Sequence, residues 1–395
     1  MNRWIHSPAF DGALIVGPAV VSVLLVLNVP ALRVERLPSW GWLVFVVGVD
    51  VAHVWSSLYR TYLDPDELRR RRTHYVVTPL VCFGAGVVLY SLGSLAFWRV
   101  LAYVAVLHFV RQQYGFVMLY RHRAGERGGV DVILDKLAIY AVMLYPLAYW
   151  HASDDRIFAW FVPGDFVALP GWTALAAGVL YGAALAAFAL RQVQRALRRE
   201  PLSWGKIGIV ASTAATWYVG IVALNSDFAF TVTNVVAHGL PYVALVWLYG
   251  RRKWIAPGAW RTQLYRPALL WAFAGLVLAL AYLEEGAWDL LVWHEHARLF
   301  GGWRLPTLPE ELLAVVVPLL VLPQVTHYVL DAWIWKFDGS NPGLPELLFG
   351  DGAPTSPPEP SALGASRRSG DASLSGTSAG VGALRVLDEP ARGPE

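Results

Sequence analysis

The sequence predicts an all-α integral membrane protein, a polytopic bundle of about ten transmembrane helices with both termini in the cytoplasm. Composition is the first reason, because 56% of the 395 residues are hydrophobic and 15% are charged, against about 25% charged residues in a typical soluble domain. The second is that apolar runs of about 20 residues, the length that crosses a hydrocarbon core, recur along most of the chain. The third is that basic residues gather in alternate loops between these runs.

The predicted spans follow one another with mostly short polar connections. The first begins near Gly12, and because it is too long for a signal peptide and lacks a clear cleavage site, we expect a retained helix. Tryptophan and tyrosine gather near span ends, as is typical of membrane interfaces. In chain order the expected spans are 12–32, 38–59, 75–95, 97–120, 132–151, 170–190, 207–224, 228–249, 267–284 and 309–336.

Basic residues follow each even-numbered predicted span, whereas the opposite loops hold acidic groups. Because loops rich in lysine and arginine stay in the cytoplasm, this alternation predicts the orientation and favours a multi-pass protein of the bacterial inner membrane. Arg69 to Arg72 are interpreted as topology determinants and contacts for anionic lipids. The other basic residues of this side are Arg60, Arg121, Arg123, Arg127, Lys136, Arg191, Arg195, Arg198, Arg199, Lys206, Arg251, Arg252 and Lys253.

The chain changes character after the last predicted span. Its end is rich in Ser, Gly, Pro and Ala and shows no apolar periodicity, which predicts disorder. We therefore divide the chain into a transmembrane domain, residues 1–338, and a disordered cytoplasmic tail, residues 339–395.

Composition also excludes several classes of function. A single cysteine, Cys82, excludes an intramolecular disulfide and a cysteine-based metal site. The net charge of +3 is small, and no basic patch with interleaved aromatic residues indicates a nucleic-acid partner. The expected partners are the lipid bilayer and a lipophilic small molecule.

Four histidines lie inside predicted spans, and each has a polar neighbour three or four residues away, on the same helical face. Ionisable side chains within a bilayer are costly, and an unpaired aspartate at its centre costs about 2.5–3.5 kcal/mol, so such groups usually serve a function. All four histidines lie on even-numbered spans at depths that differ by about 9 Å, which predicts one shared polar centre. The pairs are Asp50–His53, His108–Gln112, Asn234–His238 and His327–Asp331.

Proline follows or precedes two of these histidines. Pro241 should free the carbonyl of Ala237, and Pro323 that of Leu319, because proline lacks the N–H that a helix requires. Such kinks are tolerated in a membrane where neighbouring groups or water satisfy the backbone.

The set of residues favours an intramembrane metal centre with His53, His108, His238 and His327 as ligands. Iron is the expected metal, in oxygenase- or desaturase-like redox chemistry on a lipophilic substrate; zinc would fit hydrolysis. The clustered histidine boxes of membrane desaturases and the HExxH motif of zinc proteases are absent from the sequence. Asp50, Asp331 and Arg111 are the expected catalytic residues, with Arg111 paired to one of those acids or to an anionic substrate, and the expected cofactor-binding residues are Gln112, Asn234 and Tyr242.

Two alternatives remain open. Paired histidines can ligate haem, and the segment from Asp50 to His53 resembles haem A synthase, in which an acidic residue lies three before the first ligand. That resemblance implies a haem-binding membrane redox protein, although the acid here is aspartate and two more spans are predicted. Buried Asp/His pairs and broken helices are also typical of a proton-coupled transporter.

Overall fold

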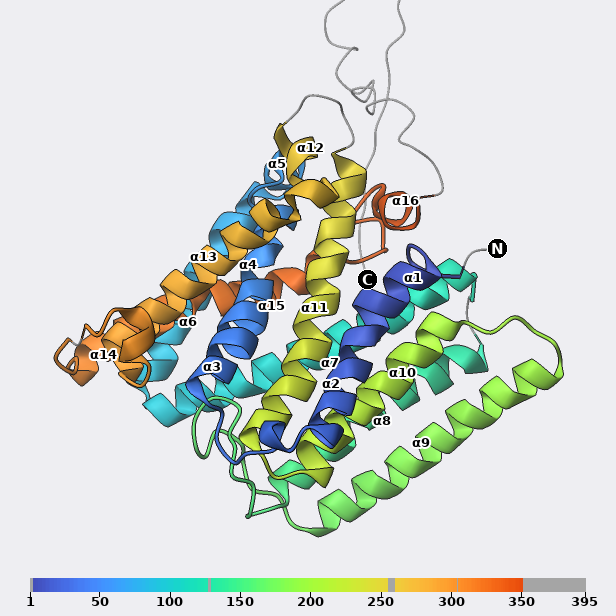
Figure 1. Ribbon diagram of the computed structural model, residues 1–395, viewed down its shortest axis with the longest axis horizontal. Helices are drawn as coiled ribbons and strands as arrows, with labels where there is room; N and C mark the ends of the chain where they lie inside the picture. Colours follow the sequence, from blue (N-terminus) through green and yellow to red (C-terminus); the bar gives the residue numbers. More distant parts are fainter. Residues whose placement is uncertain (1–2, 127–128, 255–259, 304, 351–395) are drawn as a thin grey trace, which may run out of the picture. The chain divides into compact units, whose positions relative to one another are not determined.

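The computed structural model describes residues 3–126, 129–254, 260–303 and 305–350, and this part of the chain is helical, without a strand (Figure 1). The long helices are α2 (Gly17–Asn28), α6 (Arg72–Ser91), α7 (Ser94–Ala124), α8 (Val130–His151), α9 (Trp172–Leu197), α10 (Trp204–Trp217), α11 (Asp227–Lys253), α13 (Leu270–Trp288), α14 (Glu310–Leu320) and α15 (Leu322–Ile334). The short ones are α1 (Pro8–Phe10), α3 (Ser39–Gly41), α4 (Ala52–Ser56), α5 (Pro65–Arg70), α12 (Trp260–Leu264) and α16 (Leu344–Phe349).

Eight helical stretches in the described chain are long and apolar enough to cross a membrane, or nine if the bent pair α14–α15 is one span, which indicates a multi-pass membrane protein. The predicted count of ten is not confirmed. The helix expected at 132–151 forms as α8 but is not among the eight, and its first two turns carry Asp131, Asp135 and Lys136. The eight are Pro8–Asn28, Ser39–Arg60, Arg72–Ser91, Ser94–Ala124, Trp172–Leu197, Trp204–Ala223, Asp227–Lys253 and Pro267–Trp293.

Helix α11 lies at the centre of the packing. Its most apolar stretch is 78% buried, and α11 contacts α2, α4, α7, α10 and α16. Ser226 caps its first turn by accepting a hydrogen bond from the Ala229 amide at 3.0 Å. By contrast, α9 packs chiefly against α8 and has 6% of its apolar stretch buried (Figure 1), so it presents most of its surface to lipid.

Two irregular segments precede site residues. Residues Trp42–Val51 form a π-helical stretch that leads into α4, and single π-turns inside helices are frequent at functional sites. Helices α14 and α15 meet at Val321 with a bend of 42°, between Pro318 and Pro323. The kink expected near Pro323 is therefore present.

Several arginines of the predicted cytoplasmic loops are paired with a buried acid rather than free for lipid. Glu67, on α5, forms ion pairs with Arg60 at 3.0 Å and Arg71 at 3.1 Å, and a further one with Arg70. Burial acts to raise the pKa of Glu67, but Arg60, Arg70 and the Tyr75 hydroxyl together lower it to about 2. Arg70 and Arg71 thus have a structural role in this cluster, whereas Arg69 is exposed and pairs with Asp66 at 2.8 Å.

A second ionic cluster joins α7, α8, α9 and α10. Lys206 contacts Asp135 at 2.9 Å and Glu126 at 2.5 Å, Arg195 contacts Glu126 at 2.7 Å, and Arg121 pairs with Asp135. Because each cation here has an acidic partner, the cluster ties four helix ends together at one end of the helices.

The chain beyond residue 338 begins with ordered structure. Helix α16 buries Leu344, Leu348 and Phe349 and contacts α11, while Asn341 accepts from Arg70 at 3.0 Å. Residues 351–395 of the predicted tail, and Arg127, lie outside the described residues.

Candidate metal centre

Four histidine rings converge from four helices that are far apart in sequence. His53 lies on α4, His108 on α7, His238 on α11 and His327 on α15, and their exposed fractions are 1%, 6%, 1% and 2%. The centroid of the His53 ring is 4.7 Å from that of His238 and 5.1 Å from that of His327. That of His108 is 5.0 Å from His238 and 4.7 Å from His327. The convergence expected from topology is present.

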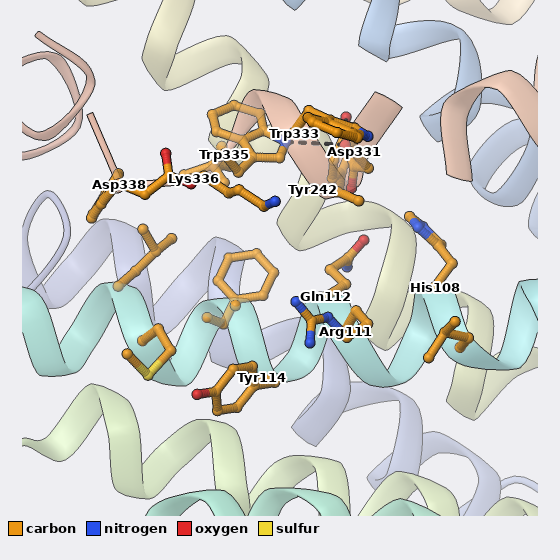
Figure 2. A pocket seen from close by; sticks show the side chains of 18 of the residues that line it. His108, Arg111, Gln112, Tyr114, Tyr242, Asp331, Trp333, Trp335, Lys336 and Asp338 are labelled. Atoms are coloured by element: carbon orange, nitrogen blue, oxygen red, sulfur yellow. Dashed lines mark hydrogen bonds between the residues drawn. The ribbon is translucent and has the colours of Figure 1, made fainter. Parts of the chain in front are cut away.

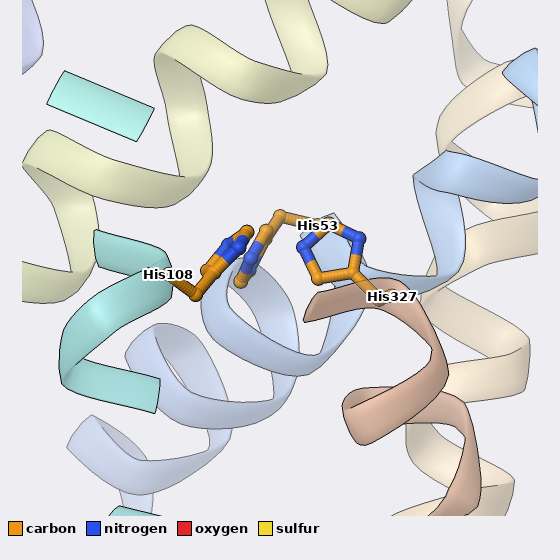
Figure 3. A group of neighbouring side chains, drawn as sticks. All are labelled: His53, His108 and His327. Carbon is orange, nitrogen blue, oxygen red and sulfur yellow. The ribbon is translucent and has the colours of Figure 1, made fainter. Parts of the chain in front are cut away.

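Three of the four rings form the tightest group. His53, His108 and His327 each offer a ring nitrogen, and these nitrogens all lie within 4.8 Å of one another (Figure 3). His238 stands beside this group and stacks on Phe109, with centroids 3.6 Å apart and planes 8° apart. Three buried imidazoles this close together can hold a metal ion, and imidazole suits iron, zinc, copper and nickel.

Most ring nitrogens of the four histidines lack hydrogen-bond partners. Nε2 of all four, and Nδ1 of His53, His238 and His327, are buried without a partner within the described residues. A buried polar atom without a partner costs about 1–3 kcal/mol, and four such atoms at one point are unusual in a purely structural cluster. A bound cation would satisfy the Nε2 atoms that reach it.

The two aspartates lie on different sides of the histidines. Asp50 Oδ1 is 3.5 Å from Nδ1 of His53, within the pairing expected from sequence. Asp331, in contrast, accepts hydrogen bonds from residues other than His327. Its Oδ1 accepts from the Tyr242 hydroxyl at 2.6 Å and from Trp335 Nε1 at 3.1 Å.

Tyr242 connects Asp331 to the centre. Its ring centroid lies 5.1 Å from that of His327 and 5.8 Å from that of His53, while its hydroxyl donates to Asp331. The tyrosine therefore lies between the carboxylate and two of the imidazoles, which the spacing along α11 alone does not show.

Glutamine side chains satisfy the backbone at the proline of α11. Gln113 Nε2 donates to the carbonyl of Ala237 at 3.3 Å, the group expected to be freed by Pro241, and Gln112 Nε2 donates to the carbonyl of His238 at 2.8 Å. Sequence reasoning named Gln112 and missed Gln113, although the adjacent pair of glutamines within an apolar helix was a signal. Both side chains fix α7 against α11 at the histidines.

Arg111 lies apart from the acids expected to pair with it. Its side chain is exposed, its guanidinium lies 5.9 Å from the centroid of the Tyr114 ring, and no ion pair of Arg111 occurs among the residues that the structure describes. Arg111 instead lines a cavity beside His108 (Figure 2).

Two cavities lie beside the centre, and His108 lines the first of them. The first, the His108 cavity, has a volume of about 970 Å³ and is lined along α7 from Val104 to His122. The second, the Asp50 cavity, has a volume of about 760 Å³. Tyr328, which sequence reasoning missed although it follows His327 directly, lines both. Among predicted residues, His108, Arg111, Gln112, Tyr242 and Asp331 line the first, and Asp50 and Asn234 line the second.

Asn234 lies on the Asp50 side with one atom unsatisfied. Its Nδ2 donates to the Phe230 carbonyl at 3.1 Å, and its buried Oδ1 has no hydrogen-bond partner in the described chain. The site thus combines buried imidazoles, an unpaired amide oxygen and two cavities.

No family model, curated protein or solved structure matches this chain.

Proposed function

We propose that the protein is a multi-pass membrane metalloenzyme with a metal ion held by His53, His108 and His327 and with His238 as a fourth ligand. The observation that carries this proposal is the group of four buried Nε2 atoms without partners. Asp50 lies 3.5 Å from Nδ1 of His53, and a carboxylate in this place would favour the tautomer that leaves Nε2 for the metal.

Iron is the metal that we propose, because a histidine-rich site in an apolar membrane interior suits oxidation of a lipophilic compound. The oxidant is dioxygen. For a hydroxylation, one oxygen atom enters a C–H bond, and the other leaves as water with two protons and two electrons from an external reductant. We assign the exchange of protons with the substrate to Asp331, because it lines the His108 cavity.

The His108 cavity supports a lipophilic substrate. Its wall on α7, from Val104 to His122, extends about 27 Å at the rise of a helix, long enough for an extended hydrocarbon chain. Its volume of about 970 Å³ lies at the upper end of small-molecule sites. Leu107 and Met118 line the cavity and are 59% and 38% exposed, so the cavity opens toward the side that lipid would cover.

The orientation in the membrane is part of this proposal. The paired arginines and lysines near Glu67 and Glu126 belong to loops on one side, which we assign to the cytoplasm of a bacterial inner membrane. Both termini then lie in the cytoplasm, with α8 counted as a tenth span.

Metal analysis of the purified protein tests the proposal. We expect about one iron per chain, and we expect His53→Ala and His327→Ala to lose it, because each removes a member of the tightest group. His151→Ala is the matched control, since both ring nitrogens of His151 already have partners, Tyr103 at 3.0 Å and the Leu147 carbonyl at 2.7 Å.

His238 provides a finer comparison. His238→Phe keeps an aromatic ring against Phe109, and because His238 lies beside the tightest group, the variant should bind metal more weakly than the wild type but at the same stoichiometry. A Soret band in the absorption spectrum would mean that the iron is bound as haem. Stoichiometric zinc would favour hydrolysis. Unchanged metal content in the His53 and His327 variants would contradict the site.

A proton-coupled transporter is the second candidate, favoured by the two cavities that lie beside the centre and are both lined by Tyr328. Proteoliposomes distinguish the candidates: a transporter moves protons or cations across the bilayer, whereas the enzyme keeps its metal and consumes dioxygen.

A further inference from the structure

The wall of the Asp50 cavity is strongly acidic. Six carboxylates line it and only one arginine, Arg36, contributes a positive charge. The carboxylates come from the π-helical segment before α4, from the start of α11, and from the end of α13 and the loop after it: Asp50, Asp227, Glu284, Glu285, Asp289 and Glu295.

These carboxylates are not neutralised by protein cations. Glu284 accepts from Trp55 Nε1 at 2.6 Å, Asp289 accepts from the His296 amide at 2.6 Å, and Asp227 accepts from the Leu37 amide at 3.2 Å. Within the described ranges none of the six forms an ion pair with lysine or arginine, in contrast to Glu67 and Glu126 at the other end of the helices. The cavity therefore gathers carboxylate oxygens that a cation can bind without displacing a lysine or arginine.

An independent observation points to a cation in this cavity. Asn234 lines it, is 3% exposed, and carries a buried amide oxygen without a partner. Amide and carboxylate oxygens are ligands that divalent cations accept. Asn234 lies one helical turn from His238 on α11, and Asp50, which lines the cavity, has its Oδ1 3.5 Å from Nδ1 of His53, so Asp50 joins the cavity to the histidines.

We propose that the Asp50 cavity is the route by which a divalent transition-metal cation reaches the histidine centre, with Glu284 and Glu285 as a transient site along it. This inference rests on the proposed metal centre. Oxygen ligands hold such a cation less tightly than imidazole does, so the ion passes from the carboxylates to the histidines. The His108 cavity is less suited to this role, because Arg111 and Lys336 line it.

The rate of metal uptake tests the route. Metal-free protein in detergent is mixed with Co²⁺, and binding is followed through the visible absorption of the histidine-ligated ion. We expect the double variant Glu284→Gln/Glu285→Gln to take up Co²⁺ at least about tenfold more slowly, because the attraction of an acidic cleft raises association rates by that order or more. The final stoichiometry should equal that of the wild type. Glutamine keeps an oxygen that can accept from Trp55.

Asp338→Asn is the matched control, since it removes one carboxylate from the wall of the His108 cavity and should leave the rate unchanged. The wild type itself gives a second measurement, because added salt should slow its uptake steeply while glutamine variants respond weakly. Equal rates in wild type and double variant, or uptake that is insensitive to salt, would overturn the route. Failure of the wild type to bind Co²⁺ at all would instead overturn the metal centre.

Discussion

At the scale of single residues, the spacing of polar groups along a helix shows which side chains share a face, but not what they meet. His53, His108, His238 and His327 were predicted to converge, and they do. Asp331 shares a face with His327, yet its hydrogen bonds come from Tyr242 and Trp335. The hydroxyl of Tyr242 reaches it from α11, and the indole of Trp335 reaches it from the end of its own helix. The part that Tyr242 plays depends on a neighbouring helix and cannot be read from α15 alone.

Arg111 leads to a prediction about the substrate. Its guanidinium lines the His108 cavity one turn from His108 and has no acidic partner among the described residues, so we expect it to bind the head group of an acidic amphiphile. Arg111→Gln should weaken binding of a long-chain carboxylic acid to the metal-free protein by at least about tenfold, the effect of losing one charge-assisted hydrogen bond worth about 1.5–3 kcal/mol.

The corresponding long-chain alcohol supplies the control for Arg111. Tryptophan fluorescence titration should show equal affinity of wild type and Arg111→Gln for the alcohol, and Arg111→Lys should recover part of the affinity for the acid. An equal loss for acid and alcohol would mean that the variant perturbs the cavity and that Arg111 does not recognise charge.

At the scale of elements, apolar length and proline predicted most helices, whereas local winding and packing partners were not predictable. The kink at Pro323 is present as the bend between α14 and α15. The π-helical stretch Trp42–Val51 was not expected, because an extra residue in a helical turn leaves no pattern in the sequence. Helix α8 forms where a span was expected, but it is not among the eight stretches, and its first two turns carry Asp131, Asp135 and Lys136.

The junction of α7 and α11 gives a prediction of its own. Gln113 satisfies the Ala237 carbonyl that Pro241 leaves without a helical donor. Gln113→Leu should therefore destabilise the protein by about 1–3 kcal/mol, the cost of a buried carbonyl without a partner. In a Pro241→Ala background the new amide at 241 can donate to Ala237, so the same substitution should cost less. Thermal unfolding of the four proteins measures this coupling, and equal costs in both backgrounds would contradict it.

At the scale of the whole molecule, hydropathy and charge alternation indicated a multi-pass helical protein, but the cavities arise only from the way helices pack. Asp50 and Glu284 are far apart in sequence, and nothing in either segment shows that both line one cavity. The buried ionic clusters around Glu67 and Glu126 are another product of tertiary structure, since their basic members were interpreted from sequence as loop charges.

The Glu67 cluster predicts how stability depends on pH. Because the pKa of Glu67 is lowered in the folded protein from 4.5 to about 2, its contribution is fully present above pH 4.5 and is lost as the pH falls toward 2. Glu67→Gln should lower the melting temperature at pH 7, since removing one partner from a buried ionic group costs about 3–5 kcal/mol. The difference from wild type should shrink below pH 4.5.

Asp66→Asn, which alters an exposed carboxylate of the same helix that pairs with Arg69, serves as the control and should change the melting temperature little at any pH. A difference between Glu67→Gln and wild type that stays constant from pH 7 to pH 3 would contradict this assignment of the lowered pKa to the ionic cluster.

The four Nε2 atoms without hydrogen-bond partners also bear on how the protein assembles in the membrane. A chain newly inserted in the bilayer gains little by bringing four unsatisfied Nε2 atoms together, so α4, α7, α11 and α15 close on one another most favourably when the ion is already present. An ion that binds the closed helices and not the separated ones shifts that equilibrium by mass action. On the proposed metal centre, the yield of correctly assembled protein in a growing cell then follows the supply of metal during synthesis.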